Sequence, residues 1–335
     1  MKKSLNLKYK SIEKEILKAK KILLLAHRAP DGDALSSVLS LNVYLKKKKK
    51  KVYIFLPQIP KFLNFLPFYQ DAVKKLPKKF DFDLVIAVDY ASDDRIEIPN
   101  NLEIPSKKII TIDHHLESSG RKIGKIKLID SNASSVAEIL YNFFKYLKIN
   151  ISKEMATILL TGVLTDTVGF SRTNQEHKKV EKVIAELILQ GANLFKIMSH
   201  YHYLDYDRGK LLGKLFERAQ RDEDLKLIYS YLKISDFSEK GLNLSEPPIF
   251  PDFLSQIGDA EIYIFLMEQK NNKLKCSLRS SMSAEIRSSA KWLNLAEIAG
   301  KFGGGGHRFA AGFKTKGTKE DVLKKIKKEL KKIRK

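Results

Sequence analysis

Short apolar runs recur in the first half of the chain, and segments with helical spacing separate several of them. The runs are of strand length and rich in β-branched residues, which is typical of buried strands. We predict strands within residues 20–27, 51–57, 83–92 and 107–115. The spacing predicts helices over residues 9–20, 33–45, 134–149, 152–167 and 178–193. This alternation predicts an α/β fold whose N-terminal domain has a parallel sheet with helices on both faces.

The pattern changes at about residue 225, where strand-like runs follow one another more closely. We predict strands within residues 225–234, 260–269 and 273–281. They indicate a smaller C-terminal α/β domain with a mixed sheet. The aromatic and charged stretch at 198–220 is interpreted as a connecting segment that contains a helix. The domains that we expect are residues 1–193 and 225–335, with a linker at 194–224.

Composition limits the classes of protein to which the chain can belong. Its 335 residues, 43% hydrophobic and 30% charged, suffice for two globular domains. Cys276 is the single cysteine, which excludes an intrachain disulfide framework, argues against a thiolate zinc site and favours a cytoplasmic setting. The N-terminus lacks the apolar region of a signal peptide, and no window approaches the roughly 20 apolar residues of a membrane span.

The formal net charge of +23 favours partners that carry phosphate. Much of the lysine lies in runs, from Lys46 to Lys51 and in the C-terminal tail. Solvated lysines on helix faces and ends are therefore an equal alternative to a role in steering a substrate.

The first cluster with candidate chemistry, HRAPDGD, follows directly on the strand-like run ILLLA. It places His27, Asp31 and Asp33 at the carboxyl end of a strand, where open α/β sheets bind ligands. Two carboxylates beside an imidazole repel each other unless a cation neutralises them. Hard oxygen donors with imidazole suit Mn²⁺ or Mg²⁺. A turn built from Pro30, Asp31 and Gly32 is the simpler alternative.

Further acids and imidazoles follow the other predicted strands. Asp89 ends one run, and Asp113, His114 and His115 end the next. Asp166 lies in an apolar helical stretch, where an unpaired carboxylate is costly, whereas Asp89 has a helix cap or turn as its alternative. Parallel strands deliver such side chains to one edge of a sheet. The residues that could together hold two divalent cations around a phosphoryl group are His27, Asp31, Asp33, Asp89, His114 and Asp166.

The glycine-rich segment KFGGGGHRFAAGF, at residues 301–313, is a candidate anion-binding element. Glycines let backbone N–H groups approach an anion, and histidine and arginine add charge-assisted donors. No Lys-Ser/Thr pair follows the glycines, so the segment is not a Walker A loop. A flexible glycine turn is the alternative, and for Arg279 the alternative is a solvated surface position. The substrate-binding candidates of this domain are Arg279, Gly304, Gly305, Gly306, His307 and Arg308.

In this order, the segments HRAPDGD, VDYAS, TIDHH, TDTVGF and FGGGGHRFAAGF resemble the motifs of the DHH phosphoesterase family and its DHH-associated C-terminal domain. The resemblance covers nearly the whole chain. More narrowly, the chain looks like the nanoRNase/pAp phosphatase type, the bifunctional oligoribonucleases. Two motifs depart from the family pattern: Leu35, Ser36 and Ser37 stand where a Gly-Ser pair is usual, and Val168 precedes Gly169 in the fourth motif.

The resemblance implies two divalent cations, usually Mn²⁺ with Mg²⁺ or Co²⁺ as alternatives, held by the six residues named above. It implies that Asp89 bridges the two ions. It also implies catalytic roles for His115, which would assist near the scissile phosphate, and for Asp113, which would orient the histidine pair. Arg279 and His307 match positions that hold the phosphate or nucleotide of the substrate.

The function implied by the resemblance is hydrolysis of very short RNA to 5′-mononucleotides, with phosphatase activity on 3′-phosphoadenosine 5′-phosphate (pAp). Linear or cyclic dinucleotides are alternative substrates. A non-catalytic nucleic-acid-binding protein is the alternative from another class. The chain has no room for the extra OB-type domain of RecJ-like exonucleases, which favours a small substrate. We expect a short RNA or small nucleotide as partner and no membrane. A homodimer is compatible with the sequence, although no residue demonstrates one.

Overall fold

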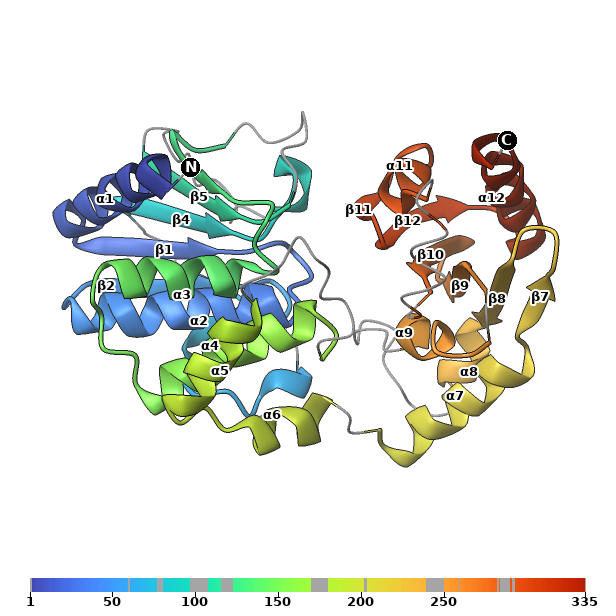
Figure 1. Ribbon diagram of the computed structural model, residues 1–335, viewed down its shortest axis with the longest axis horizontal. Coiled ribbons are helices and arrows are strands. Elements are labelled where there is room, and N and C mark those ends of the chain that lie inside the picture. The colour runs from blue at the N-terminus through green and yellow to red at the C-terminus, as the bar shows by residue number, and fades with distance from the viewer. Residues whose placement is uncertain are drawn as a thin grey trace. The chain divides into compact units, whose positions relative to one another are not determined.

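The computed structural model divides the chain into two compact units, Met1–Tyr203 and Leu204–Lys335 (Figure 1). The structure describes the chain apart from residues 1, 60, 77–80, 97–107, 116–122, 170–179, 202–203, 239–249, 259, 282, 284–289, 291–292 and 335. Among the helices in the described part of the chain, none combines the length and the hydropathy that a bilayer-spanning segment needs.

The first unit contains a six-stranded sheet in which every neighbouring pair is parallel. Its strands are β1 (Lys21–Leu25), β2 (Lys51–Phe55), β3 (Ala72–Val73), β4 (Leu84–Val88), β5 (Ile109–Asp113) and β6 (Ile126–Ile129). The spatial order is β3-β2-β1-β4-β5-β6. The predicted parallel sheet and its strands β1, β2, β4 and β5 are confirmed. The edge strands β3 and β6 were not predicted, because each is too short to form a distinct apolar run.

The strand order reverses its direction between β1 and β4. From β1 the chain proceeds outward to β2 and β3, whereas from β4 it proceeds to β5 and β6 on the other side. The segments that leave the carboxyl ends of β1 and β4 therefore diverge. A crevice at such a switch point is the usual ligand site of an open α/β sheet.

Helices of the first unit pack on one face of this sheet. They are α1 (Lys2–Lys18), α2 (Gly32–Lys47), α3 (Val136–Tyr146), α4 (Lys153–Asp166), α5 (Val180–Leu189) and α6 (Leu194–Tyr201). All six contribute to the apolar cluster that contains the sheet residues Leu24, Ile86 and Ile112. Helix α1 begins earlier than predicted, because Leu5 continues the helical spacing of Tyr9 and packs against the same core.

The opposite face of the sheet is covered differently. Its apolar cluster joins strand residues such as Leu23 and Val85 to Phe82, Tyr90 and Ile96 from connecting segments. In the connections from β4 to β5 and from β5 to β6, the described residues Tyr90, Ile96 and Ile123 lie on this face. The described parts of those connections contain only a 3₁₀ helix, η3 (Asp93–Arg95). Helices were expected on both faces; within the described residues they lie on one.

Gly162 allows helix α4 to approach α2 and α3 closely. A Cβ atom at this position would lie 2.6 Å from the Cβ of Ala137 and 3.0 Å from the Oδ1 of Asp33. Both neighbours belong to packed helices, so neither can move without disturbing the core. The glycine therefore sets the distance between the helices that surround Asp33.

We expect Gly162→Ala to lower the free energy of unfolding by about 1–2 kcal/mol, since overpacking outweighs the gain in helix propensity. Gly209→Ala is a matched control, because a Cβ there meets nothing within 4 Å. The control should raise stability by about 0.5–1 kcal/mol. Urea unfolding of both variants measures the difference. Equal effects of the two substitutions would show that the close approach at Gly162 is unimportant.

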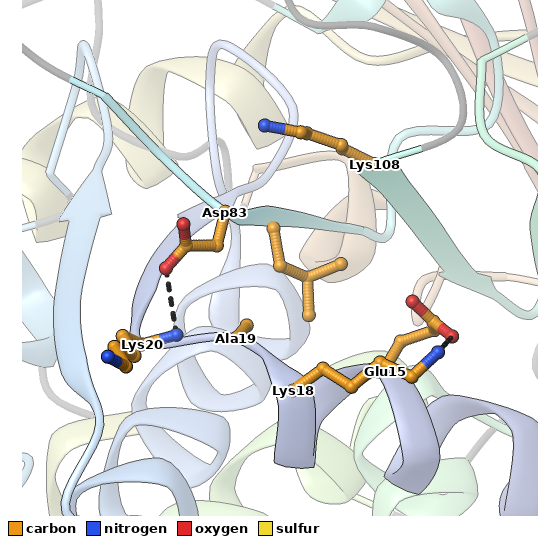
Figure 2. A pocket seen from close by; sticks show the side chains of 7 residues that line it. Glu15, Lys18, Ala19, Lys20, Asp83 and Lys108 are labelled. Carbon is orange, nitrogen blue, oxygen red and sulfur yellow. Dashed lines mark hydrogen bonds and ion pairs between the residues drawn. The ribbon is translucent and has the colours of Figure 1, made fainter.

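A shallow cavity of about 340 Å³ lies at the amino ends of β1 and β4, at the edge opposite to the carboxyl ends (Figure 2). Asp83 lines it and accepts hydrogen bonds from the backbone N–H groups of Lys20 and Lys21, both at 2.8 Å. These hydrogen bonds stabilise the ionised carboxylate and therefore lower the pKa of Asp83. Its role is therefore to hold the start of β1 beside the start of β4.

The second unit contains its own six-stranded sheet, with the order β11-β12-β10-β9-β8-β7. Strands β8 and β9 are parallel and the other neighbours are antiparallel, so the predicted mixed sheet is confirmed. The strands are β7 (Gln220–Asp222), β8 (Leu227–Leu232), β9 (Ile262–Gln269), β10 (Lys273–Ser280), β11 (Gly305–His307) and β12 (Ala310–Lys316). The helices are α7 (Tyr206–Glu217), α8 (Ile234–Ser238), α9 (Phe250–Leu254), α11 (Leu295–Gly300) and α12 (Lys319–Ile333).

Two apolar clusters cover the faces of this second sheet. Helices α11 and α12 pack on one face, against residues such as Leu274, Cys276 and Phe313. Helices α7, α8 and α9 pack on the other, over strands β8 and β9. The lysine-rich C-terminal tail, noted from the sequence only as a charge run, forms most of α12. Its buried Ile326 and Leu330 face the sheet, and the lysines remain on the solvent side.

Candidate metal centre at the carboxyl edge of the parallel sheet

The first loop of the candidate site leaves the carboxyl end of β1. His27 follows that strand and is only 4% exposed. Asp31 caps helix α2, since its Oδ1 accepts the N–H of Ala34 at 3.1 Å. Asp33 lies in the first turn of the helix and is 1% exposed. A strand end and a helix start thus place an imidazole and two carboxylates at one edge of the sheet.

Asp113 shapes the second loop, which leaves the carboxyl end of β4. Asp89 and Ala91 adopt left-handed backbone conformations, with φ of 50° and 59°. Asp113, at the end of the neighbouring strand β5, accepts the N–H groups of Tyr90 at 3.1 Å and Ala91 at 2.9 Å. The other oxygen of Asp113 accepts the backbone N–H of His115 at 3.0 Å and lies 2.8 Å from its Nδ1. This buried carboxylate therefore positions both Asp89 and His115.

Asp89 lies at the centre of the cluster. Its Oδ2 is 3.8 Å from the Nε2 of His27, and its Oδ1 is 3.7 Å from the Nε2 of His114 and 3.4 Å from the Nδ1 of His115. The Oδ1 atom is buried and accepts no hydrogen bond within the described residues. A buried carboxylate oxygen without a donor is costly unless a cation occupies its place.

Three groups of potential metal ligands contain Asp89. They are His27, Asp31 and Asp89; Asp33, Asp89 and His114; and Asp89, Asp113 and His115. In the third group Asp113 already accepts backbone N–H groups, which leaves the first two groups as the candidates for metal ions. Within each group, one ligand atom from each residue lies within 4.8 Å of the others. The sharing of one carboxylate between two groups is the arrangement that a two-metal site requires.

Asp166 completes the set of carboxylates. It is the last residue of α4, and its Oδ2 lies 3.1 Å from the Nε2 of His114. Just beyond it, Val168 has φ of 51°. This conformation favours glycine and is rare for a β-branched residue. Glycine is the usual residue at this position in the family that the motif resembles. Phe170, the last residue of the same motif, lies outside the described residues.

Electrostatics favour a cation at this edge. Burial, followed by the negative charges of Asp31 and Asp33, raises the pKa of Asp89 well above its usual value. Burial and the charge of Asp166 raise the pKa of Asp33 to about 7. Divalent cations would reverse both shifts, because they stabilise the ionised carboxylates. The donor set, with imidazole nitrogens and carboxylate oxygens, fits such ions.

We expect Asp33 to contribute more to the stability of the metal-free protein at pH 5.5 than at pH 8. The folded pKa of Asp33, about 7, exceeds its usual 3.8, so the folded state binds more protons in this range. Its contribution is present at low pH and is lost as pH rises through the folded pKa. In the presence of chelator, we compare the unfolding free energy at pH 5.5 with that at pH 8. The gain at the lower pH should be about 1–3 kcal/mol smaller in Asp33→Asn than in the unaltered protein. Equal pH dependence of both proteins would contradict the assignment.

The start of helix α3 holds Asp33 and was not predicted as part of the site. The N–H of Val136 donates to its Oδ2 at 2.6 Å, and the N–H of Ala137 donates to its Oδ1 at 2.8 Å. Ser135 caps the helix and accepts the N–H of Glu138 at 3.1 Å. The spacing of Ser135 and Glu138 is a capping-box signal that marks the helix start in the sequence. Nothing in the sequence indicates that Asp33 would contact it.

The same segment orients His114. The carbonyl oxygen of Ala133 lies 3.4 Å from the Nδ1 of His114, which directs the Nε2 atom toward Asp89 and Asp166. Burial lowers the pKa of His115 to about 4 despite its bond to Asp113, so His115 is neutral near pH 7. When its Nδ1–H donates to Asp113, the Nε2 of His115 is left as an acceptor.

The substrate-binding candidates all lie in the second unit. The glycine-rich segment forms a hairpin in which β11 pairs with β12 and carries Gly305, Gly306 and His307. Gly306 has φ of 143°, and a Cβ there would lie 2.6 Å from the Cα of Ala311, so a glycine is required. Gly304 precedes this hairpin.

Two arginines of this unit bind other parts of the same unit. Arg279 is partly buried, and its Nε donates to the Oδ1 of Asp252 on α9 at 2.7 Å. Arg308 is exposed, and its Nε donates to the carbonyl oxygen of Leu293 at 3.2 Å. The sequence did not indicate either partner.

Comparison with known proteins identifies both parts of the chain. Residues 21–163 match the model described as the DHH family, N-terminal domain, and residues 224–333 match the DHHA1 domain. The resemblance inferred from the five motifs is therefore confirmed.

Two similar relatives carry the same name. The bifunctional oligoribonuclease and PAP phosphatase NrnA of Thermus thermophilus is 28% identical over 327 residues, covering 94% of this chain and 93% of the relative. The protein of that name from Bacillus subtilis is 26% identical over 296 residues, covering 87% and 88%. Among solved structures, an exopolyphosphatase-related protein from Bacteroides fragilis has a TM-score of 0.81 at 25% identity, covering 97% of this chain and 96% of that one.

Proposed function

The chain belongs to the DHH family of phosphoesterases, and on this premise we propose that it hydrolyses short oligoribonucleotides to 5′-mononucleotides and removes the 3′-phosphate from pAp. The observation that carries the proposal is that Asp89 is shared by the ligand group around His27 and the ligand group around His114. Relatives named as bifunctional oligoribonuclease and PAP phosphatase, similar over nearly the whole chain, support this substrate class.

We assign two divalent cations, with Mn²⁺ first and Mg²⁺ or Co²⁺ as alternatives, to the cluster around Asp89. The residues that would hold them are His27, Asp31, Asp33, Asp89, His114 and Asp166. When bound, such ions supply a hydroxide nucleophile at neutral pH and neutralise charge on the phosphoryl group. The left-handed backbone of Asp89, held through Asp113, presents its carboxylate to both groups of ligands.

His115 and Asp113 act beside the metal ligands in this proposal. A neutral His115 can donate or accept a proton near the phosphate, and its bond to Asp113 selects the tautomer. Asp113 is a positioning residue, because it acts through His115 and the loop of Asp89. The phosphate or nucleotide of the substrate would be bound by the glycine-rich hairpin, which carries His307 and Arg308. Arg279, which forms an ion pair with Asp252, would also bind it.

The borders of the domains and the setting of the protein are part of the proposal. We place the DHH domain at residues 1–193, the linker at 194–224 and the DHH-associated domain at 225–335. The family match at 224–333 supports the start of the DHH-associated domain. A chain with one cysteine suits the cytoplasm. A homodimer stays a prediction.

The experiment that tests the proposal is hydrolysis of a labelled RNA ladder of about two to twenty-four nucleotides, beside pAp and cyclic dinucleotides. Reactions contain either Mn²⁺ or chelator. Turnover that requires Mn²⁺ and is fastest on dimers and trimers supports the proposal. A preference for cyclic dinucleotides would make the protein a signalling phosphodiesterase. Tight RNA binding without turnover of any substrate would refute the enzyme and leave a binding protein.

A further inference from the structure

One face of the second sheet carries basic and small side chains in register across β10, β11 and β12. Residues that are directly opposite in a sheet point to the same face. In the first row, His307 pairs with Ala310, and Ala310 pairs with Arg279. This row joins two substrate-binding candidates from different strands, with a small side chain between them.

The next row along these strands consists of small residues. Gly305 pairs with Gly312, and Gly312 pairs with Ser277. The apolar residues of β10 and β12, such as Cys276 and Phe313, point to the other face, where α11 and α12 pack. The row of small residues therefore forms a low floor that continues from His307 and Arg279 along the strands.

Lysines form the two rows after this floor. Lys275 pairs directly with Lys314, and Lys273 pairs directly with Lys316. We refer to these four residues as the lysine strip. Lys273, Lys314 and Lys316 are exposed, and Lys275 is half-buried. Like charges that are directly opposite on neighbouring strands destabilise a sheet, so folding alone does not account for two successive pairs.

Acidic neighbours do not neutralise the centre of the strip. Within the described residues, neither Lys275 nor Lys314 forms an ion pair with a carboxylate. Burial, followed by the charges of Lys314 and Arg279, lowers the pKa of Lys275 to about 8. A bound anion would relieve this repulsion.

We propose that the lysine strip binds the phosphodiester backbone of a single-stranded oligonucleotide, beyond the nucleotide that the glycine-rich hairpin and Arg279 hold. The inference rests on the proposed function, because it extends the substrate site of the same reaction. Arg279 lies four residue steps from Lys275 along β10, which corresponds to about 13 Å. That span is too long for one phosphate and suits a backbone that continues along the sheet. Dimers and pAp would end before they reach the strip.

The test removes the central pair and measures dependence on substrate length. K275Q/K314Q should keep the kcat/KM for a dimer and for pAp within about twofold and lower the kcat/KM for an eight-nucleotide RNA about tenfold or more. For that RNA, the slope of log Kd against log salt should fall by about 1.4, since a single strand contributes about 0.7 per phosphate contact. The melting temperature should not fall, because the substitution removes repulsion.

K324Q/K325Q is the matched control. It removes the same number of charges from the same unit, at exposed positions of α12, which packs on the other face of the sheet. The control should leave the dependence on substrate length unchanged. Its salt slope should fall much less than that of K275Q/K314Q, because only the net charge of the protein is lowered. Comparable losses in both variants would overturn the lysine strip in favour of non-specific attraction.

Other outcomes separate this inference from the proposed function. Equal loss on the dimer and on the eight-nucleotide RNA would overturn the inference, because the lysines would then contact the terminal nucleotide. No loss on either RNA would overturn it too. If the unaltered protein hydrolyses no RNA, the proposed function fails. Binding of labelled RNA then tests the lysine strip independently of hydrolysis. An unchanged salt slope in K275Q/K314Q would overturn the inference.

Discussion

Replacing Asp89 with asparagine is expected to lower kcat about a thousandfold or more while the fold is retained. Asp89 is the only residue that the two assigned ligand groups, around His27 and around His114, have in common. An amide could not supply the negative charge that the two proposed cations would share, so both proposed metal positions would be weakened at once. Removal of any other single ligand would leave one group intact.

The same substitution should leave the metal-free protein at least as stable as before. Asp89 is 2% exposed, its pKa is raised by burial and by Asp31 and Asp33, and its φ of 50° is a conformation that asparagine tolerates. Asparagine therefore removes buried repulsion without a backbone penalty. Added Mn²⁺ should raise the melting temperature of the unaltered protein and not that of Asp89→Asn.

Calorimetry with and without Mn²⁺, beside RNA dimer hydrolysis, measures both effects. Asp83→Asn is the control, since Asp83 precedes the same strand at its amino end and its carboxylate accepts hydrogen bonds from the backbone of Lys20 and Lys21 there (Figure 2). The control should retain full activity and the full response to Mn²⁺. Activity of Asp89→Asn within tenfold of the unaltered protein would refute the bridging role of Asp89.

Replacement of Asp113 is expected to damage stability and activity to different extents, depending on the residue introduced. Asp113→Ala leaves the N–H groups of Tyr90, Ala91 and His115 without their acceptor in a buried place. We expect a loss of about 3 kcal/mol or more in unfolding free energy. The left-handed loop that carries Asp89 would no longer be held.

Asp113→Asn separates positioning from folding. Its amide oxygen can still accept the N–H groups of Tyr90 and Ala91, but its amide nitrogen cannot accept a proton from His115. We expect a stability loss of about 1–2 kcal/mol and a fall in kcat of about a hundredfold, with KM nearly unchanged. The pH profile of kcat should shift as well, because the tautomer of His115 is no longer selected.

Urea unfolding and steady-state kinetics of the two variants provide the measurement. If Asp113→Asn lost activity only in proportion to the fraction unfolded, Asp113 would be structural alone. Full activity of Asp113→Asn with an unchanged pH profile would show that His115 needs no partner for orientation.

The sequence alone determined the four central strands of the first sheet, β1, β2, β4 and β5, and the position of its candidate chemistry. Runs such as ILLLA and LVIAV are apolar at every position, which is typical of strands buried on both faces of a parallel sheet. His27, Asp89 and Asp113 follow or end these runs. Because parallel strands end at one edge, their convergence could be expected before any distance was known.

Only the tertiary structure decided how these side chains are held. Asp33 accepts two backbone N–H groups from the start of α3, more than a hundred positions away along the chain. Asp113 fixes the loop of Asp89 across two neighbouring strands. Such bonds depend on which elements lie side by side and on the side-chain direction within each. Neither is encoded in local spacing.

The faces of both sheets were also decided by the tertiary structure. Helices gather on one face of the first sheet within the described residues, since the connections after β4 cross the other face without a described α-helix. The pairing of Lys275 with Lys314 follows from the register of β10 and β12, and a shift by one residue would separate them. The sequence thus determines which segments form strands and helices and which acidic residues lie at their ends, because these follow from local pattern. Pairing across the sheet determines which of them meet, because register depends on the whole packed core.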